Sequence, residues 1–231
     1  MTAPRELMIS IHVPKTGGGS FRSVLEAYAD GHYQRDQGDL PLAPRSPRQR
    51  LRLAMARPQV KPDTRVVHGH FIATKYWRRY PDATYVCWFR DPVERLASHY
   101  YYWQRSPDLD HPTCRQLLDE QLSLEAFAAL PEMRDVHRTL LGEVPLERLA
   151  FVGITERYDE SLERFRRRFA PELQLRTTRR HVNTERSGER YDIDDTTRDR
   201  IAALNEGDME LYRSALARFE AAASPTALAA P

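Results

Sequence analysis

The chain has few cysteines and no long apolar run. Its 231 residues include two cysteines, Cys87 and Cys114, which are too few for a scaffold held together by disulfides. No segment approaches the 18 consecutive apolar residues that a membrane-spanning helix needs. Residues 1–6 lead directly into an apolar segment, so we expect no signal peptide. These absences favour a soluble, cytoplasmic protein with no membrane span.

A strong excess of charge of one sign is also missing. The 35 Lys and Arg residues nearly balance the 33 Asp and Glu residues, for a net charge of +2. A protein dedicated to binding nucleic acid has a larger positive excess, so we expect no nucleic-acid partner, although a local basic groove for an anion remains compatible. The length fits one domain with a sizeable core, over residues 1–221, followed by a disordered tail over residues 222–231.

Strand patterns alternate with helix patterns along the chain. Four segments have the composition of buried strands: residues 7–13, 65–68, 83–89 and 149–154. Helical patterns lie between and after them. The alternation predicts an α/β fold, a P-loop-like three-layer sandwich with a central, mostly parallel sheet flanked by helices. Two regions match no motif: residues 31–63, with a helix expected over about 47–57, and residues 106–145, which we expect to be mostly helical.

A glycine-rich loop follows the first strand. It consists of Pro14, Lys15, Thr16, Gly17, Gly18, Gly19, Ser20 and Phe21. Glycines let backbone N–H groups crowd around a phosphate-like anion, and the helix that follows adds the positive end of its dipole. Lys15 supplies a charge, and Thr16 and Ser20 supply hydroxyl groups. A Walker A loop would end in Gly-Lys-Ser/Thr, and this loop does not. We expect Ser20 to cap the helix.

A second anion site is expected after the strand at residues 83–89. Arg90 ends this strand, Asp91 and Pro92 have the pattern of an N-cap and a first helical position, and Ser98 lies about two turns into the helix. The carboxyl ends of parallel strands meet at one edge, so Arg90 and Ser98 can grip a phosphate together. The alternatives are a local Arg90–Asp91 ion pair and a serine on the helix surface.

His68, Gly69 and His70 follow another strand. A histidine suits the removal of a proton from a hydroxyl group, because its pKa lies near neutrality. The two rings can instead be histidines that only hydrogen-bond the backbone. A zinc site with His12 is a further alternative, although no CxxC or HExxH spacing supports it.

These motifs, taken together, resemble the carbohydrate sulfotransferases, most closely the heparan sulfate and dermatan/chondroitin 2-O-sulfotransferase type. The resemblance lies in residues 13–21, 68–70 and 89–102, in their order along the chain, and extends to residues 151–156 and 180–184. It implies an O-sulfotransferase that uses 3′-phosphoadenosine 5′-phosphosulfate (PAPS) and releases 3′-phosphoadenosine 5′-phosphate, with no metal required. We expect no membrane anchor or stem like those of the animal enzymes.

The resemblance also implies roles for individual residues. Lys15 would neutralise charge on the leaving oxygen, and His70 would be the base with His68 assisting, although the choice between the two histidines rests on the resemblance alone. The 5′-phosphosulfate would lie in the loop from Pro14 to Phe21, and the 3′-phosphate against Arg90 and Ser98. The basic loop with His181, Asn183 and Thr184 would close over the donor.

Two other functions compete with this one. A P-loop kinase or NTPase would explain the loop and the sheet, but not the missing Gly-Lys-Ser/Thr ending. A non-catalytic nucleotide- or glycan-binding protein would have no need of a base. The expected acceptor is a small molecule or an oligosaccharide, most simply a sugar hydroxyl. The sequence predicts neither its identity nor the oligomeric state.

Overall fold

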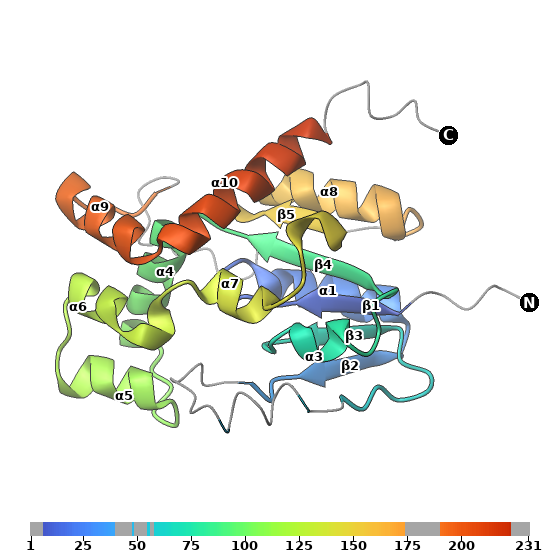
Figure 1. The fold of residues 1–231 in the computed structure, drawn as a ribbon, viewed down its shortest axis with the longest axis horizontal. Helices are drawn as coiled ribbons and strands as arrows, with labels where there is room; N and C mark the ends of the chain where they lie inside the picture. The colour runs from blue at the N-terminus through green and yellow to red at the C-terminus, as the bar shows by residue number, and fades with distance from the viewer. Residues whose placement is uncertain (1–6, 40–47, 49–54, 56–57, 174–189, 223–231) are drawn as a thin grey trace, which may run out of the picture.

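The centre of the molecule is a parallel sheet. The computed structural model describes residues 7–39, 48, 55, 58–173 and 190–222. Within them five strands form one sheet in the order β2-β3-β1-β4-β5, and every neighbouring pair is parallel (Figure 1). The strands are β1 (Met8–Ile11), β2 (Tyr33–Asp36), β3 (Val66–Gly69), β4 (Thr84–Phe89) and β5 (Leu149–Ile154). The predicted α/β fold with a parallel sheet is confirmed.

Helices cover both faces of the sheet. Helices α1 (Gly18–Ala29) and α8 (Tyr158–Phe169) pack on one face, in a core that includes Met8, Phe21 and Phe165. Helices α3 (Thr74–Trp77), α7 (Val136–Leu141) and α10 (Glu206–Ala221) pack on the other, in a core that includes Ile9 and Ile11. Because both faces are covered, strands such as β1 are almost wholly apolar.

A third group of helices lies beyond the carboxyl ends of the strands, at the left of Figure 1. It consists of α4 (Pro92–Arg105), α5 (Pro112–Asp119), α6 (Leu124–Ala129) and α9 (Asp195–Leu204). Their shared core includes Leu96, Trp103 and Phe127. Single 3₁₀ turns are η1 (Pro131–Met133), η2 (Leu146–Arg148) and η3 (Thr155–Arg157). The helical character expected for residues 106–145 is confirmed. These helices lie next to the edge of the sheet that carries the predicted site residues.

The helix caps were predicted with mixed success. The Asp91 carboxylate accepts hydrogen bonds from the N–H groups of Val93 and Glu94, and Pro92 opens α4 as expected. The prediction for Ser20 was wrong: α1 begins at Gly18, and its N-cap is Gly17, which has a left-handed φ of 84°. Only a glycine adopts this conformation without steric cost, so the helix starts earlier and Ser20 lies inside its first turn.

Sequence patterns missed strand β2. It has four residues, Tyr-Gln-Arg-Asp, at the edge of the sheet, and none of them is fully buried, so it lacks the apolar run or alternation by which strands are found. The helix expected over 47–57 lies outside the described residues except for residues 48 and 55, and the expected tail lies outside them beyond residue 222. No helix in the described part of the chain has both the length and the apolar character to cross a membrane.

Candidate functional site

The sheet has a topological switch point between β1 and β4. From β1 the chain crosses to one side of the sheet, to β2, and from β4 it crosses to the other, to β5. Where neighbouring strands send their connections in opposite directions, the loops at their carboxyl ends separate and leave room for a ligand. The glycine-rich loop follows β1 and Arg90 follows β4, so both predicted anion-binding segments lie at this switch point.

The glycine-rich loop has an unusual backbone. Lys15 has a φ of 70° and Gly17 a φ of 84°. Left-handed residues inside a short loop turn neighbouring N–H groups toward one side, as in the nests that bind anions. A non-glycine residue such as Lys15 adopts this conformation at a cost, and strain of this kind gathers at functional sites. The Thr16 hydroxyl donates a 2.8 Å hydrogen bond to the carbonyl oxygen of Val13, which closes the loop.

Two side chains tie this loop to the end of β4. Arg90, whose exposed fraction is 7%, donates a 3.0 Å hydrogen bond from Nη1 to the carbonyl oxygen of Lys15. The Thr155 hydroxyl lies 3.0 Å from the carbonyl oxygen of Thr16 and 2.9 Å from that of Phe89, and donates to either. The two halves of the site are therefore held at a fixed separation. No local sequence pattern singles out Thr155, although its segment is part of the resemblance.

The ammonium group of Lys15 lies over an aromatic ring. Its Nζ is 3.6 Å from the centre of the Tyr102 ring on α4, within the range of a cation–π interaction. Burial, followed by the charges of Arg90 and Arg105, lowers the pKa of Lys15 to about 8. The lysine is thus partly desolvated beside other cations, and an anion bound next to it would favour its charged form. The sequence pattern around Tyr102 is typical of a residue that packs in the core or against a helix, and it does not indicate this contact.

Three histidine rings stack beside the loop. The His12 ring lies between His68, at 4.9 Å between ring centroids, and His70, at 4.1 Å. His68 Nδ1 lies 2.9 Å from the Ser10 hydroxyl, and burial lowers the pKa of His68 to about 3. The rings stack instead of converging on one point. No group of three potential ligands among the described residues could hold a metal ion, so the zinc alternative gains no support there.

The hydrogen bond of His70 decides its tautomer. His70 Nδ1 lies 2.7 Å from the carbonyl oxygen of His12. A carbonyl oxygen only accepts, so Nδ1 must carry the proton, and Nε2 of the neutral ring has a free lone pair. Burial lowers the pKa of His70, the His12 carbonyl raises it in part, and Arg35 lowers it further, with a net decrease. His70 is therefore neutral at neutral pH and presents a basic nitrogen.

An ion-pair cluster braces the chain next to His70. Lys75 Nζ lies 2.7 Å from Oδ2 of Asp36 and 3.0 Å from Oδ2 of Asp39. The same Asp39 oxygen accepts a hydrogen bond from the backbone N–H of Ile72 at 2.9 Å. All three charged side chains are largely buried, so the cluster fixes the loop after β2 against the residues that follow His70.

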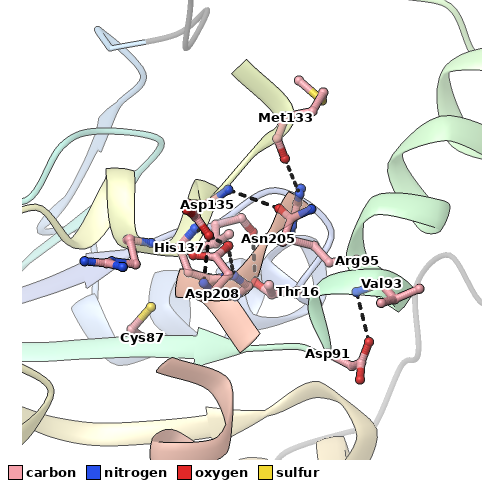
Figure 2. A network of polar contacts seen from close by, with 12 residues as sticks. Thr16, Cys87, Asp91, Val93, Arg95, Met133, Asp135, His137, Asn205 and Asp208 are labelled. Atoms are coloured by element: carbon pink, nitrogen blue, oxygen red, sulfur yellow. Dashed lines mark hydrogen bonds and ion pairs between the residues drawn. The ribbon is translucent and has the colours of Figure 1, made fainter. Parts of the chain in front are cut away.

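A buried network lies behind the site, at the junction of α4, α7 and α10 (Figure 2). The Arg95 guanidinium is fully buried and donates from Nη2 to the carbonyl oxygen of Met133, while its Nε and Nη1 have no partner among the described residues. Burial lowers the pKa of Arg95 to about 10, and the charge of Asp208 partly offsets this effect. Asp208 accepts from the backbone N–H and from Nδ1 of His137. The network joins α4 to the start of α10.

The remaining predicted residues lie on the helices α4 and α1, in the core, or outside the described part of the chain. Ser98 is on the buried face of α4, and Gly19 is exposed at the start of α1. Phe21 is fully buried between Trp88 and Phe165, so its side chain belongs to the core and not to a binding surface. The residues of the basic loop lie outside the described part of the chain: His181, Asn183 and Thr184.

Comparison with known proteins gives only distant likenesses. No family model and no curated protein matches the chain. Among solved structures, a sulfotransferase from Alicyclobacillus acidocaldarius is similar over 93% of this chain and 96% of its own, with 13% identity and a TM-score of 0.48. Mouse sulfotransferase SULT7A1 complexed with PAP is similar over 90% and 66%, with 13% identity and a TM-score of 0.40. At these values the likenesses carry no weight for function, which must be argued from the chain's own residues.

Proposed function

We propose that the protein is a sulfotransferase that moves a sulfuryl group from PAPS to an acceptor hydroxyl. The observation that carries the proposal is the link between Arg90 and the Lys15 carbonyl oxygen. His70 directly follows β3, which pairs with β1, so two cations and a base lie at one edge of the sheet. PAPS has anionic groups at two ends, and an acceptor hydroxyl needs a base, so one reaction uses all three groups.

The loop and Arg90 suit the two ends of the donor. The N-terminus of α1, the left-handed loop and Lys15 form an anion-binding surface for the 5′-phosphosulfate. Arg90 and Ser98 are proposed for the 3′-phosphate, because a guanidinium fork and a hydroxyl together satisfy several phosphate oxygens. His181, Asn183 and Thr184 are proposed to complete the donor site. The donor-binding role of Phe21 is restricted to its backbone by the burial of its ring.

The chemical step then follows from the charges. His70 Nε2 takes the proton of the acceptor hydroxyl as the acceptor oxygen forms its bond to sulfur. The bond between sulfur and the bridging phosphate oxygen breaks, and Lys15 neutralises the negative charge left on that oxygen. Transfer of this kind depends on positioning and electrostatics, as phosphoryl transfer does. His68 is proposed to assist only through packing, because its low pKa and burial keep it from exchanging protons near neutrality.

The acceptor is proposed to be a carbohydrate. A sugar hydroxyl is not acidic and requires a base, and His70 has the tautomer for that task. The proposal also rests on the resemblance of residues 13–21, 68–70 and 89–102 to carbohydrate sulfotransferases.

Calorimetric titration with 3′-phosphoadenosine 5′-phosphate, with and without magnesium and beside ATP, tests the donor. We expect micromolar binding of the bisphosphate that does not depend on magnesium, and weak binding of ATP. ATP binding that requires magnesium, with no signal from the bisphosphate, would favour the kinase alternative and contradict the proposal. Transfer of labelled sulfate from PAPS to a panel of oligosaccharides then tests the acceptor.

A further inference from the structure

His12 occupies the middle of the histidine stack. Its ring is partly buried between His68 and His70, at 4.9 and 4.1 Å. Gly18 makes this position possible: a Cβ atom at Gly18 would lie 1.9 Å from Nε2 of His12. His12 therefore occupies a restricted space and contacts one face of the proposed base. Donor binding alone does not explain this position.

The histidine stack can carry only one positive charge at a time. Two imidazolium rings whose centroids lie 4.1 Å apart would repel each other strongly, because little water screens charges at this separation in a partly buried site. A neutral ring beside a single imidazolium is instead tolerated, because its π face is electron-rich. The first proton that enters the stack therefore excludes a second, and His12 is lowered in pKa by burial and by both neighbouring histidines.

The hydrogen bonds decide which ring takes that proton. Protonation of His70 strengthens its existing bond from Nδ1–H to the His12 carbonyl oxygen, because a charged donor makes the stronger bond. The Nδ1 atom of His68 lies 2.9 Å from the Ser10 hydroxyl, and its Nε2 is buried with no hydrogen-bond partner among the described residues. Protonation therefore has the lowest free-energy cost at His70.

Other charges act on the same group. Arg35 from β2 lowers the pKa of His70 and of His12, and Lys15 from the loop lowers that of His12. His99 from α4 is also close enough for His70 to lower its pKa, and it is itself neutral because of burial. The charged side chains that shift the pKa of His12 and His70 are all cationic, so none of them would draw a second proton into the stack.

We propose that His12 is a positioning residue for His70. Its carbonyl oxygen sets the tautomer that leaves Nε2 free, and its ring, seated against Gly18, holds the His70 ring in place and confines proton uptake to it. The inference rests on the proposed function for its catalytic meaning. Its structural content, the tautomer and the order of titration, is testable without any substrate.

The test is nitrogen NMR of the histidine rings during a pH titration, on wild type and on His12→Ala and His12→Phe. In wild type we expect a proton on Nδ1 of His70 and a pKa below 6.5. His12→Ala lets water reach the face of the ring, so the pKa of His70 should rise by about half a unit to one unit. His12→Phe keeps a ring without a titrating nitrogen and should restore the wild-type value.

Gly18→Ala gives a second route to the same result, because its methyl group would displace the His12 ring without removing it. It should shift the pKa of His70 in the same direction as His12→Ala. His32 is exposed, and His32→Ala is the control that should shift nothing. A His70 pKa that is the same in wild type, His12→Ala and Gly18→Ala, or a proton on Nε2 in wild type, would overturn the inference.

Kinetics separate the inference from the proposed function. His12→Ala should lower turnover about tenfold, a part of the contribution of a general base, and should move the acid limb of the rate profile with the His70 pKa. The KM for PAPS should not change, and His12→Phe should recover most of the turnover. If wild type binds no bisphosphate, the proposed function fails while the NMR result still stands. If binding and transfer are normal but the acid limb stays in place, the role of His12 in catalysis is wrong.

Discussion

The guanidinium group of Arg90 donates a hydrogen bond to the carbonyl oxygen of Lys15, 75 positions earlier in the chain. The bond joins the two neighbouring strands whose connections diverge, at the place where α/β proteins bind ligands. The guanidinium group has five N–H donors, and this bond occupies one of them. The shape of the loop and the charge of the site therefore depend on one residue.

Arg90→Ala should weaken donor binding. The change would leave the proposed 3′-phosphate without its charged partner, which costs about 2 to 4 kcal/mol. Calorimetry with 3′-phosphoadenosine 5′-phosphate measures the loss, and the 3′-dephosphorylated nucleotide is the matched ligand control. Arg90→Ala should reduce the preference of wild type for the 3′-phosphorylated form. A wild type that binds the two nucleotides equally would remove the case for a 3′-phosphate site.

Lys15→Ala should affect turnover more than donor affinity. If the ammonium group acts on the leaving oxygen in the transition state, its loss lowers turnover about a hundredfold or more. The pKa of Lys15, lowered to about 8, adds a pH signature. The charged form is lost as the pH rises through that value, so kcat/KM for the donor should fall on the alkaline side.

Lys15→Arg is the matched variant for this signature, because a guanidinium stays charged at alkaline pH. It should retain part of the turnover and lose the alkaline limb near pH 8. An alkaline limb that persists in Lys15→Arg would assign that ionisation to another group. Unchanged turnover in Lys15→Ala would refute the proposed role.

The sequence predicted the strands, loops and helix starts that carry the candidate site, but not the long-range contacts between them. The apolar run of β4 followed by Arg90, Asp91 and Pro92 predicted a buried strand, a charged residue at its tip and a capped helix, because each of these features depends on neighbours in the chain. The contacts of Tyr102 and Thr155 with the loop were missed, because they join residues 87 and 139 positions apart, and neither residue type is unusual in its local pattern.

The roles of the histidines also depend on long-range contacts that the local sequence does not reveal. Two imidazoles separated by Gly69 predicted a base, but the choice between His68 and His70 depends on what each Nδ1 faces, Ser10 on the neighbouring strand or the carbonyl oxygen of His12. That information lies 58 positions away in the chain. The position of His12 against Gly18 is likewise a matter of packing and has no local signature.

Buried histidines should make the protein sensitive to acid. Burial lowers the pKa of His12, His68 and His99 from the value of 6.5 that applies in the unfolded chain. Below pH 6.5 the unfolded chain therefore binds protons that the folded protein does not. Stability is complete above pH 6.5 and falls as the pH decreases, with a slope of at most about 1.4 kcal/mol per pH unit for each histidine.

Thermal unfolding between pH 7.5 and pH 5.0, above the range in which most carboxylates titrate, measures this slope. His99→Phe removes one of the titrating groups and should flatten the curve, while His32→Ala, at an exposed position, should leave it as in wild type. A midpoint that does not change from pH 6.5 to pH 5.0 would show that these rings are protonated in the folded state.

Asp208→Asn should destabilise the junction of α7 and α10 and leave Arg95 without a compensating charge. Asp208 is fully buried and accepts hydrogen bonds from two atoms of His137, and its charge acts on the buried guanidinium. Leaving buried donors without their charged acceptor costs about 1 to 3 kcal/mol. Combining it with Arg95→Met removes the stranded charge, so the double variant should unfold at a higher denaturant concentration than Asp208→Asn alone. Strictly additive losses in this double-mutant cycle would mean that the two groups do not interact.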